Sequence, residues 1–303
     1  MVRYVNVELD SVRLAQYAQQ VPCYICEGAN TFDAELCRHC YAPMALAHQA
    51  RSQKVRPQLM AVIGSSGVGK TVYLGMLLDM MSRQTNSWQV LARGAFSITL
   101  QQSTVAALAG CRFPEKTPND PDRWNWVHCQ VRPPRKRHAR EIIVPDVAGE
   151  SILEEIDHPH TYPGIRALLS RCSAAMVMVD APRLGTDGGE QDFFAMKVLT
   201  YLSELIEDPR HGWHNRPVAV VFSKADQCES AFDSPAAYAA ERATGLWRHC
   251  RERFKQHQFF ACSVTGACVS RLTPDGRRVK APLRIEPRGI VEPFVWLNSR
   301  MKG

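Results

Sequence analysis

One eight-residue pattern constrains this chain more than any other feature of its sequence. Residues 64–71 read Gly-Ser-Ser-Gly-Val-Gly-Lys-Thr and match G-x-x-x-x-G-K-[ST]. An apolar run, Leu59–Ile63, precedes them, and a stretch with helical character, Val72–Met81, follows. Glycines in such a strand-to-helix turn let backbone N–H groups point inward at phosphates, where the positive end of the helix dipole also lies. The pattern predicts a phosphate-binding loop; the alternative is a Gly-rich turn that binds nothing.

Two side chains of this loop have expected chemical roles. Lys70 would reach the β- and γ-phosphates, and the Thr71 hydroxyl would be a ligand of Mg²⁺. The remaining positions would cradle the phosphates through their backbone: Gly64, Ser65, Ser66, Gly67, Val68 and Gly69. The loop alone indicates a class of ligand and no reaction.

Length and composition bound the domain organisation. With 303 residues, 45% of them hydrophobic, the chain can bury one sizeable core and carry a small accessory module. We expect an N-terminal segment at 1–20, a metal-binding ribbon at 21–43, a linker at 44–57 and the main domain at 58–303. No apolar stretch approaches the roughly 18 residues of a membrane span, and the N-terminus lacks a signal-peptide pattern. We therefore expect a cytoplasmic protein without a membrane span.

The cysteines divide into one cluster and a scattered remainder. Of eleven, four form two C-x-x-C pairs, Cys23 with Cys26 and Cys37 with Cys40, while the other seven are scattered singly. Scattered single cysteines fit a reducing compartment. Two residues between thiols let a tight turn aim both sulfurs at one ion, so two such turns complete a tetrahedral Zn²⁺ site. We expect a structural zinc ribbon whose folding free energy comes from the metal. Because four thiolates fill the tetrahedral site, His39 has no coordination position.

The main domain alternates strand-like and helix-like segments. Such alternation favours an α/β fold, here a three-layer architecture with a mainly parallel sheet and helices on both faces. In these folds the ligand lies beyond the carboxyl ends of the strands, where every remaining motif of this chain also falls. The expected strands are 59–63, 126–131, 141–144, 174–179, 218–222 and 258–261.

A D-x-x-G motif follows one of these strands. Asp146 would hold Mg²⁺ through water, and the backbone N–H of Gly149 would meet the γ-phosphate. The same four residues also suit an ordinary type I turn. Their position directly after a buried strand favours the metal and phosphate interpretation.

The segment that follows strand 218–222 indicates which base is bound. Asp226 can accept hydrogen bonds from guanine N1–H and N2–H together, and the stem of Lys224 can pack over the base plane. Adenine has no such donor pair, so a site of this kind discriminates strongly between the bases. Ser223 would tie this segment to the phosphate-binding loop. The alternative is a strand that stops at a polar turn.

A second segment of small residues supports guanine recognition. Cys262, Ser263 and Val264 lie at the end of the next strand, and a backbone N–H of Ser263 or Val264 could approach guanine O6. In isolation this segment would mean little.

With these four motifs in this order, the chain resembles the P-loop GTPases of the Ras-like, translation-factor-related class. The resemblance covers about Pro57 to the C-terminus, and it extends to bacterial GTPases of multi-protein effector systems in which a zinc ribbon precedes the GTPase domain. It implies binding of GTP and GDP, dependence on Mg²⁺, and two switch segments that reorder when the γ-phosphate is lost.

Three departures from the pattern of these GTPases concern catalysis and affinity. Ser223 replaces the usual Asn or Thr, Glu150 replaces the Gln that orients the attacking water, and Ser66 replaces a Gly. Glu150 would bring negative charge toward a polyanionic transition state, and Ser66 leaves less room for an incoming arginine finger. These departures from the family pattern indicate slow hydrolysis; the alternative is that Glu150 swings out of the site.

The first switch segment is enlarged. We place an insertion at about 83–125, with an amphipathic helix at 96–109. Thr117 lies in a Pro-bounded loop just before the second strand, and we expect it to be the Mg²⁺-binding threonine of switch I. A threonine before a proline is also an ordinary turn residue.

These features favour a guanine-nucleotide switch that hydrolyses GTP slowly and signals to a protein partner. The alternative is a non-hydrolysing, nucleotide-bound scaffold. The scaffold would use the ribbon and the basic segment Arg132–Arg140 for contacts with a partner or with nucleic acid. The net charge of +7 is modest for this length, and the basic segment fits a solvated hairpin tip, so nucleic acid is not favoured. The oligomeric state stays open.

Overall fold

The structure is a computed structural model of the chain. Residues 1–18 of the expected N-terminal segment and residues 135–138 of the basic segment lie outside the residues it describes. The structure describes residues 19–301 except 54–55, 84–87, 135–138, 185, 187–188, 206–214, 273–275 and 277.

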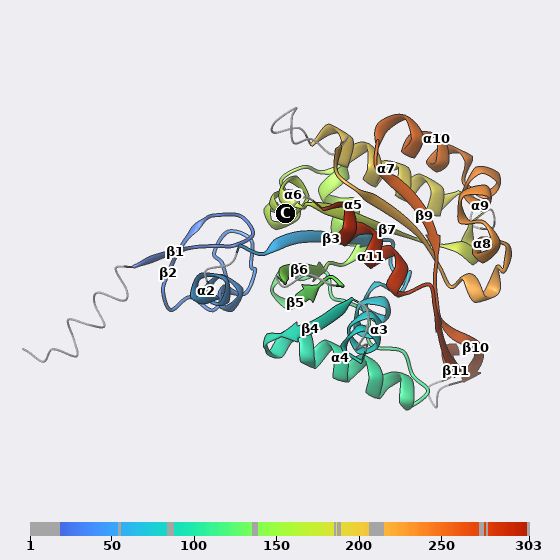
Figure 1. Ribbon diagram of the computed structural model, residues 1–303, viewed down its shortest axis with the longest axis horizontal. Coiled ribbons are helices and arrows are strands. Elements are labelled where there is room, and N and C mark those ends of the chain that lie inside the picture. Colours follow the sequence, from blue (N-terminus) through green and yellow to red (C-terminus); the bar gives the residue numbers. More distant parts are fainter. Residues whose placement is uncertain are drawn as a thin grey trace, which may run out of the picture.

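A seven-stranded sheet in the order β4-β5-β6-β3-β7-β8-β9 forms the centre of the main domain (Figure 1). From β6 to β9 all neighbours are parallel, and β4 and β5 add an antiparallel edge. The mainly parallel sheet expected from the sequence is confirmed. The strands are β3 (Gln58–Gly64), β4 (Gln89–Arg93), β5 (Asn125–Arg132), β6 (Arg140–Asp146), β7 (Ala174–Asp180), β8 (Val218–Ser223) and β9 (His257–Ala261).

Alternate residues of the strands point to opposite faces of the sheet and pack in two apolar layers. In β3, Ala61 and Ile63 pack with one buried cluster and Met60 and Val62 with the other, as the two-residue period of a strand requires. Figure 1 shows α3 and α4 on the side of the sheet opposite α7 and α10. The helices are α2 (Met44–Gln53), α3 (Lys70–Ser82), α4 (Gly94–Ala109), α5 (Gly149–Asp157), α6 (Pro163–Arg171), α7 (Glu190–Glu204), α8 (Ser230–Asp233), α9 (Pro235–Arg242), α10 (Thr244–Arg253) and α11 (Val291–Arg300).

Helix α4 is the helix expected inside the insertion. Its buried residues, Ser97, Leu100, Thr104 and Leu108, recur every three or four positions and form one stripe. This stripe packs on α3, where a Cβ on Gly75 would lie 2.3 Å from the Thr104 hydroxyl oxygen. The insertion is thereby fixed to the helix that follows the phosphate-binding loop.

The N-terminal module consists of β1 (Gln20–Pro22), β2 (Ala29–Thr31) and two cysteine turns, followed by α2. The segment 44–57, expected to be a linker, is thus largely helical, because Met44, Leu46 and Ala47 are buried. Val21 and Ile25 of the module belong to the same apolar cluster as Ile165 and Leu168 of α6. The module therefore packs directly on the main domain.

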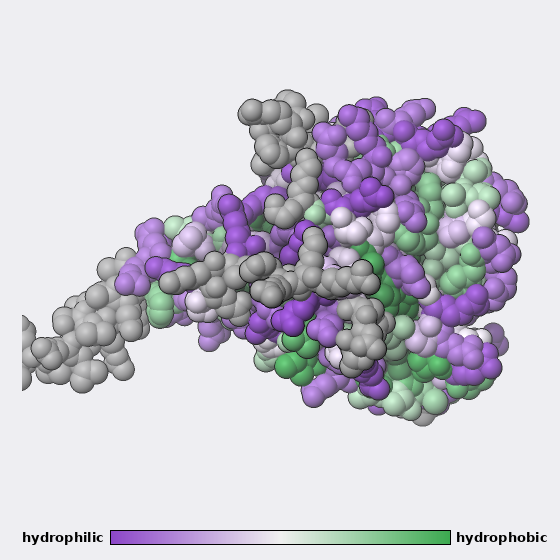
Figure 2. Space-filling view, in the orientation of Figure 1, coloured by the Kyte–Doolittle hydropathy of each residue, from purple (hydrophilic) through white to green (hydrophobic). Residues whose placement is uncertain are grey.

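A long antiparallel hairpin, β10 (Ser263–Leu272) with β11 (Arg278–Arg288), forms a separate two-stranded sheet. Of the residues that connect the two strands, only Gly276 is described. The face of the molecule seen in Figure 2 is largely hydrophilic, with hydrophobic residues in small patches. Within the described residues, no helix combines the length and the apolar character needed to cross a membrane.

Candidate nucleotide-binding site

The phosphate-binding loop joins the end of β3 to the start of α3. Gly67 and Gly69 adopt φ angles of +72° and +101°, the left-handed conformation that L side chains rarely adopt. The loop borders a cavity of about 370 Å³ that is also lined by Thr117, Gly149 and Lys224. The motifs that lie far apart in the sequence therefore surround one cavity.

Lys70 is the buried cation of this cavity. Its side chain is 7% exposed, and Nζ donates to the carbonyl oxygens of Gly64 at 2.8 Å and Ser65 at 3.3 Å. Burial lowers the pKa of Lys70, while the carboxylates of Asp146 and Glu150 act in the opposite direction. A partly desolvated ammonium group beside an open loop is suited to bind phosphate oxygens.

Three oxygen-bearing side chains converge beside the loop. The Thr71 hydroxyl donates to Asp146 Oδ2 at 2.7 Å, and the Thr117 hydroxyl donates to the same oxygen at 2.9 Å. The two threonine oxygens are 3.0 Å apart. Asn125 adds a hydrogen bond from Nδ2 to Asp146 Oδ2 at 3.3 Å, which is a contact that the sequence motifs did not predict.

This cluster fits a Mg²⁺ ion. Asp146 is fully buried, and its Oδ1 atom has no hydrogen-bond partner among the described residues. A buried carboxylate oxygen without a partner is costly unless a ligand satisfies it. Mg²⁺ prefers oxygen ligands in octahedral geometry and keeps several waters, so Thr71, Thr117 and Asp146 offer a suitable donor set.

Gly149 lies against the backbone of the phosphate-binding loop. A Cβ at this position would be 2.5 Å from the carbonyl oxygen of Gly64 and 2.8 Å from the backbone nitrogen of Ser66. No side chain fits there, so this approach requires glycine. The start of α5 is therefore in contact with the loop that would hold the phosphates.

The segments that would recognise the base are joined to each other. The Ser263 hydroxyl donates to Asp226 Oδ1, and Ser263 is buried. Backbone hydrogen bonds run from Ala225 N–H to Cys262 O at 3.1 Å and from Cys262 N–H to Phe222 O at 2.8 Å. Ser263 thus contributes a side chain that orients Asp226, in addition to the backbone role expected from the sequence. Val264 lines the same cavity.

Two residues near the base-recognition segments were not predicted as site residues by the sequence motifs. Asp180, at the end of β7, is 2% exposed and accepts a hydrogen bond from Lys224 Nζ. Gln191 Oε1 accepts from the Ser65 hydroxyl at 3.0 Å and from the Asp180 N–H at 3.3 Å. The signal for Asp180 was its position, since a carboxylate that directly follows a buried strand lies at the ligand edge of the sheet.

Ser223 differs from the expectation. Its hydroxyl was expected to tie the base-recognition segment to the phosphate-binding loop, but it donates to the carbonyl oxygen of Val179 at 3.3 Å. Because the serine side chain is short, its hydroxyl stays near its own backbone and donates to the neighbouring strand β7. The connection to the loop runs instead from Lys224 through Asp180 and Gln191 to Ser65.

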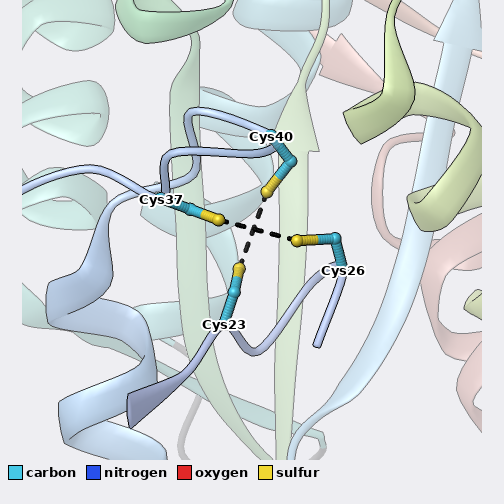
Figure 3. A group of neighbouring side chains, drawn as sticks. All are labelled: Cys23, Cys26, Cys37 and Cys40. Atoms are coloured by element: carbon cyan, nitrogen blue, oxygen red, sulfur yellow. Dashed lines mark hydrogen bonds between the residues drawn. The ribbon is translucent and has the colours of Figure 1, made fainter. Parts of the chain in front are cut away.

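The four cysteines of the N-terminal module form a second site, apart from the cavity. Figure 3 shows their sulfurs directed at a common centre. Sγ of Cys23 lies 3.6 Å from that of Cys40, Sγ of Cys26 lies 3.5 Å from that of Cys37, and all four lie within 4.8 Å of one another. Tetrahedral coordination with Zn–S bonds of about 2.3 Å places sulfurs roughly 3.8 Å apart, so the set fits Zn²⁺.

Three features define the chain as a P-loop GTPase domain. They are a glycine-rich strand-to-helix loop, a buried Asp–Thr cluster beside it and a carboxylate at the base-recognition end. The family model for double-GTPase 2 matches residues 58–272. The chain belongs to this family, and GTP binding is the property that goes with it.

The chain is similar to solved structures of a GTP-binding protein and of a GTPase-like domain at low sequence identity. Nucleolar GTP-binding protein 1 of Plasmodium falciparum is 13% identical, with a TM-score of 0.42 over 81% of this chain and 86% of that one. The Ski7 GTPase-like domain of S. cerevisiae, bound to GDP and inorganic phosphate, is 14% identical, with a TM-score of 0.44 over 84% of this chain and 52% of that one. Among curated proteins, none matches.

Proposed function

We propose that this protein is a guanine-nucleotide switch that binds GTP with Mg²⁺, hydrolyses it slowly and signals its state to a protein partner. The convergence of Thr71, Thr117 and Asp146 on one point beside the phosphate-binding loop carries the proposal. These residues come from α3, the switch I loop and the end of β6, so a nucleotide-bound Mg²⁺ would hold three separate segments together. Loss of the γ-phosphate would release them.

Each side chain would then have one task. Lys70 would bind the β- and γ-phosphates, Thr71 and Thr117 would bind Mg²⁺, and Asp146 would orient its shell. Mg²⁺ would neutralise charge on the β- and γ-oxygens. The backbone of Gly149, which touches the loop, would detect the γ-phosphate, and Asp226 would select guanine.

Slow hydrolysis follows from the side chain next to Gly149. Glu150 carries a carboxylate where related GTPases carry a water-orienting amide, and it forms an ion pair with Lys116. Burial acts to raise the pKa of Glu150, but contacts with Lys116 and Ser66 lower it below its ordinary value. The group is therefore ionised at neutral pH and unsuited to donate a hydrogen bond to a water or a phosphate.

The path from the nucleotide to a partner would run through the zinc ribbon. Helix α5 begins at Gly149, and α6 follows it in the chain. Arg171, the last residue of α6, donates to the carbonyl oxygens of Tyr24 at 3.2 Å and Ile25 at 2.7 Å, between the first two cysteines. A shift of α5 on loss of the γ-phosphate would thereby reach the ribbon and the surface it presents.

A single-turnover assay tests this function. The full chain, loaded with radiolabelled GTP and Mg²⁺, should release phosphate slowly. Lys70→Ala should abolish the release, and Lys255→Ala, which removes an exposed lysine on the loop after α10, should not. Equal binding of ATP and GTP would refute the guanine-specific part of the proposal.

A second candidate function is a scaffold that holds nucleotide without turnover. The ion pair between Lys116 and Glu150 favours it, because this pair already joins the two switch segments across the cavity. The same assay separates the two functions. GTP that stays intact on the protein for hours would support the scaffold.

A further inference from the structure

Lys116 and Glu150 both line the nucleotide cavity, and their side chains are in contact. Lys116 directly precedes the Mg²⁺-site residue Thr117, and Glu150 directly follows Gly149. Their side chains form an ion pair between Nζ and Oε1, although the residues are 34 positions apart in the chain. Both residues line the cavity beside the phosphate-binding loop. No GTPase motif of the sequence assigns a role to Lys116.

The surroundings of this pair are those of a phosphate site. Both charges act on Lys70, the loop cation: Glu150 raises its pKa and Lys116 lowers it. On the other side, Glu150 contacts Ser66 of the loop, and its Oε2 atom is buried without a hydrogen-bond partner in the described structure. A cation and an anion thus stand at the end of the loop that would hold the terminal phosphate.

The ion pair is too exposed for stabilisation of the fold to be its main role. The Lys116 side chain is 62% exposed and that of Glu150 is 36% exposed. Exposed ion pairs contribute little to stability because water screens them. A terminal phosphate carries more negative charge than one carboxylate and offers three acceptor oxygens, so it would compete well for the ammonium group.

We propose that Lys116 is a γ-phosphate ligand supplied by switch I, and that Glu150 holds its ammonium group when no γ-phosphate is present. This inference rests on the proposed function. In the GTP state Lys116 leaves Glu150 and neutralises charge on the γ-phosphate, where a cation also stabilises the transition state of phosphoryl transfer. The freed Glu150 side chain is repelled by the same phosphate and turns out of the cavity, while switch I closes and the Gly149 backbone stays at the γ-phosphate.

The exchange of partners makes Lys116 a residue that distinguishes GTP from GDP. Removal of its charge should weaken binding of a GTP analogue and leave binding of GDP unchanged, because GDP has no group at that position. Charge-assisted hydrogen bonds of this kind correspond to a factor of about ten or more in affinity. Removal of the Glu150 charge should have the opposite sign, since the analogue then no longer competes with a carboxylate for Lys116.

The test measures dissociation constants of fluorescent GppNHp and GDP with the full chain and Mg²⁺. Lys116→Met should weaken GppNHp binding about tenfold with GDP binding within twofold, Lys116→Arg should retain the preference, and Glu150→Gln should tighten GppNHp binding. The matched control is Lys197→Met, which breaks the similarly exposed ion pair between Lys197 and Asp157 outside the cavity.

Two results would overturn the inference: an unchanged GppNHp affinity of Lys116→Met, or an equal loss for both nucleotides. Failure of the proposed function is distinguishable from both. It would show in the unmodified chain, as absence of guanine-nucleotide binding, before any variant is compared.

Discussion

The hydroxyl of Ser263 donates a hydrogen bond to the carboxylate of Asp226, across 37 residues of sequence. Ser263 is the first residue of β10, and Asp226 lies in the turn after β8. A carboxylate held by a buried hydroxyl loses part of its freedom before any base arrives, which lowers the entropic cost of recognition. Ser263→Ala should therefore weaken guanine-nucleotide binding severalfold without changing the choice of base. Competition between GTP and ATP for the variant would show this, and a gain in ATP affinity would contradict it.

Asp146 should control the dependence of nucleotide binding on Mg²⁺. Asp146→Asn removes the negative charge to which Thr71 and Thr117 both donate, so we expect Mg²⁺ to bind roughly 10- to 100-fold more weakly in the nucleotide complex. Titration of Mg²⁺ into the complex with fluorescent GDP measures the effect. Asp122→Asn, an exposed carboxylate in the insertion, is the control. Equal Mg²⁺ dependence of the two variants would show that Asp146 does not support the metal.

Gly149→Ala should displace the backbone of the phosphate-binding loop, although the substituted residue is not part of that loop. The added Cβ would overlap backbone atoms of Gly64 and Ser66, and backbone cannot move aside as a flexible side chain can. Overpacking of this kind costs about 1–3 kcal/mol, which should appear as a lower free energy of unfolding and weaker GTP binding. Gly110→Ala is the control, because its Cβ would lie 3.3 Å from the nearest atom. Urea unfolding of both variants measures the difference, and equal midpoints would argue against a close contact.

Loss of the zinc site should weaken the ribbon and the domain on which it packs. Cys37→Ser should abolish stoichiometric zinc binding, and it should lower the melting temperature because Val21 and Ile25 share an apolar cluster with α6. Cys111→Ser, at an exposed free thiol, should change neither quantity. Metal analysis and thermal unfolding give both readouts. Full zinc content in Cys37→Ser would mean that the four thiolates are not the ligands.

The stability of the protein should fall as the solution is acidified, in part through His128. Burial lowers the pKa of His128 below its ordinary value of 6.5, although Glu141 acts in the opposite direction; Arg93 lowers it further. Since the unfolded chain then binds more protons than the folded chain, the free energy of unfolding decreases as pH falls through about 6.5. Oε1 of Gln49 in α2 lies 2.9 Å from Nδ1 of the same ring and accepts its hydrogen bond.

Urea unfolding at pH 7.5 and 5.5 checks this dependence. His128→Gln should reduce the loss of stability between the two pH values, and His158→Gln, at an exposed position after α5, should leave it unchanged. An identical slope in His128→Gln would assign the pH dependence to other groups.

Much of the fold could be predicted because local sequence pattern decides it. The buried strands β3, β6, β7 and β8 are short apolar runs that end in polar residues, and the polar ends mark the ligand edge of the sheet. Thr117 could be proposed for the same reason, since it precedes β5 at that edge. Helix α2 was harder to foresee, because it is stabilised by burial of Met44 and Leu46 in its module more than by its own pattern.

Side-chain partners across the cavity could not be predicted from the motifs. The hydrogen bond between Ser65 and Gln191 spans 126 residues, and the pair of Lys224 with Asp180 spans 44. Such contacts depend on how strands and loops are placed in three dimensions. The hydroxyl of Ser223 illustrates the limit, because the sequence indicated its chemistry but could not indicate that Val179 would be its partner.

Base selection by Asp226 is the central claim, and a change of ligand tests it most directly. Asp226→Asn in the full chain should lose GTP affinity by several orders of magnitude and gain affinity for xanthosine triphosphate, whose base presents an acceptor where guanine presents the N2 amino group. Asp233→Asn, at an exposed position in α8, should bind GTP as the unmodified chain does. Competition binding of the two nucleotides to Asp226→Asn gives the answer. Undiminished GTP affinity with no gain for xanthosine triphosphate would contradict the account.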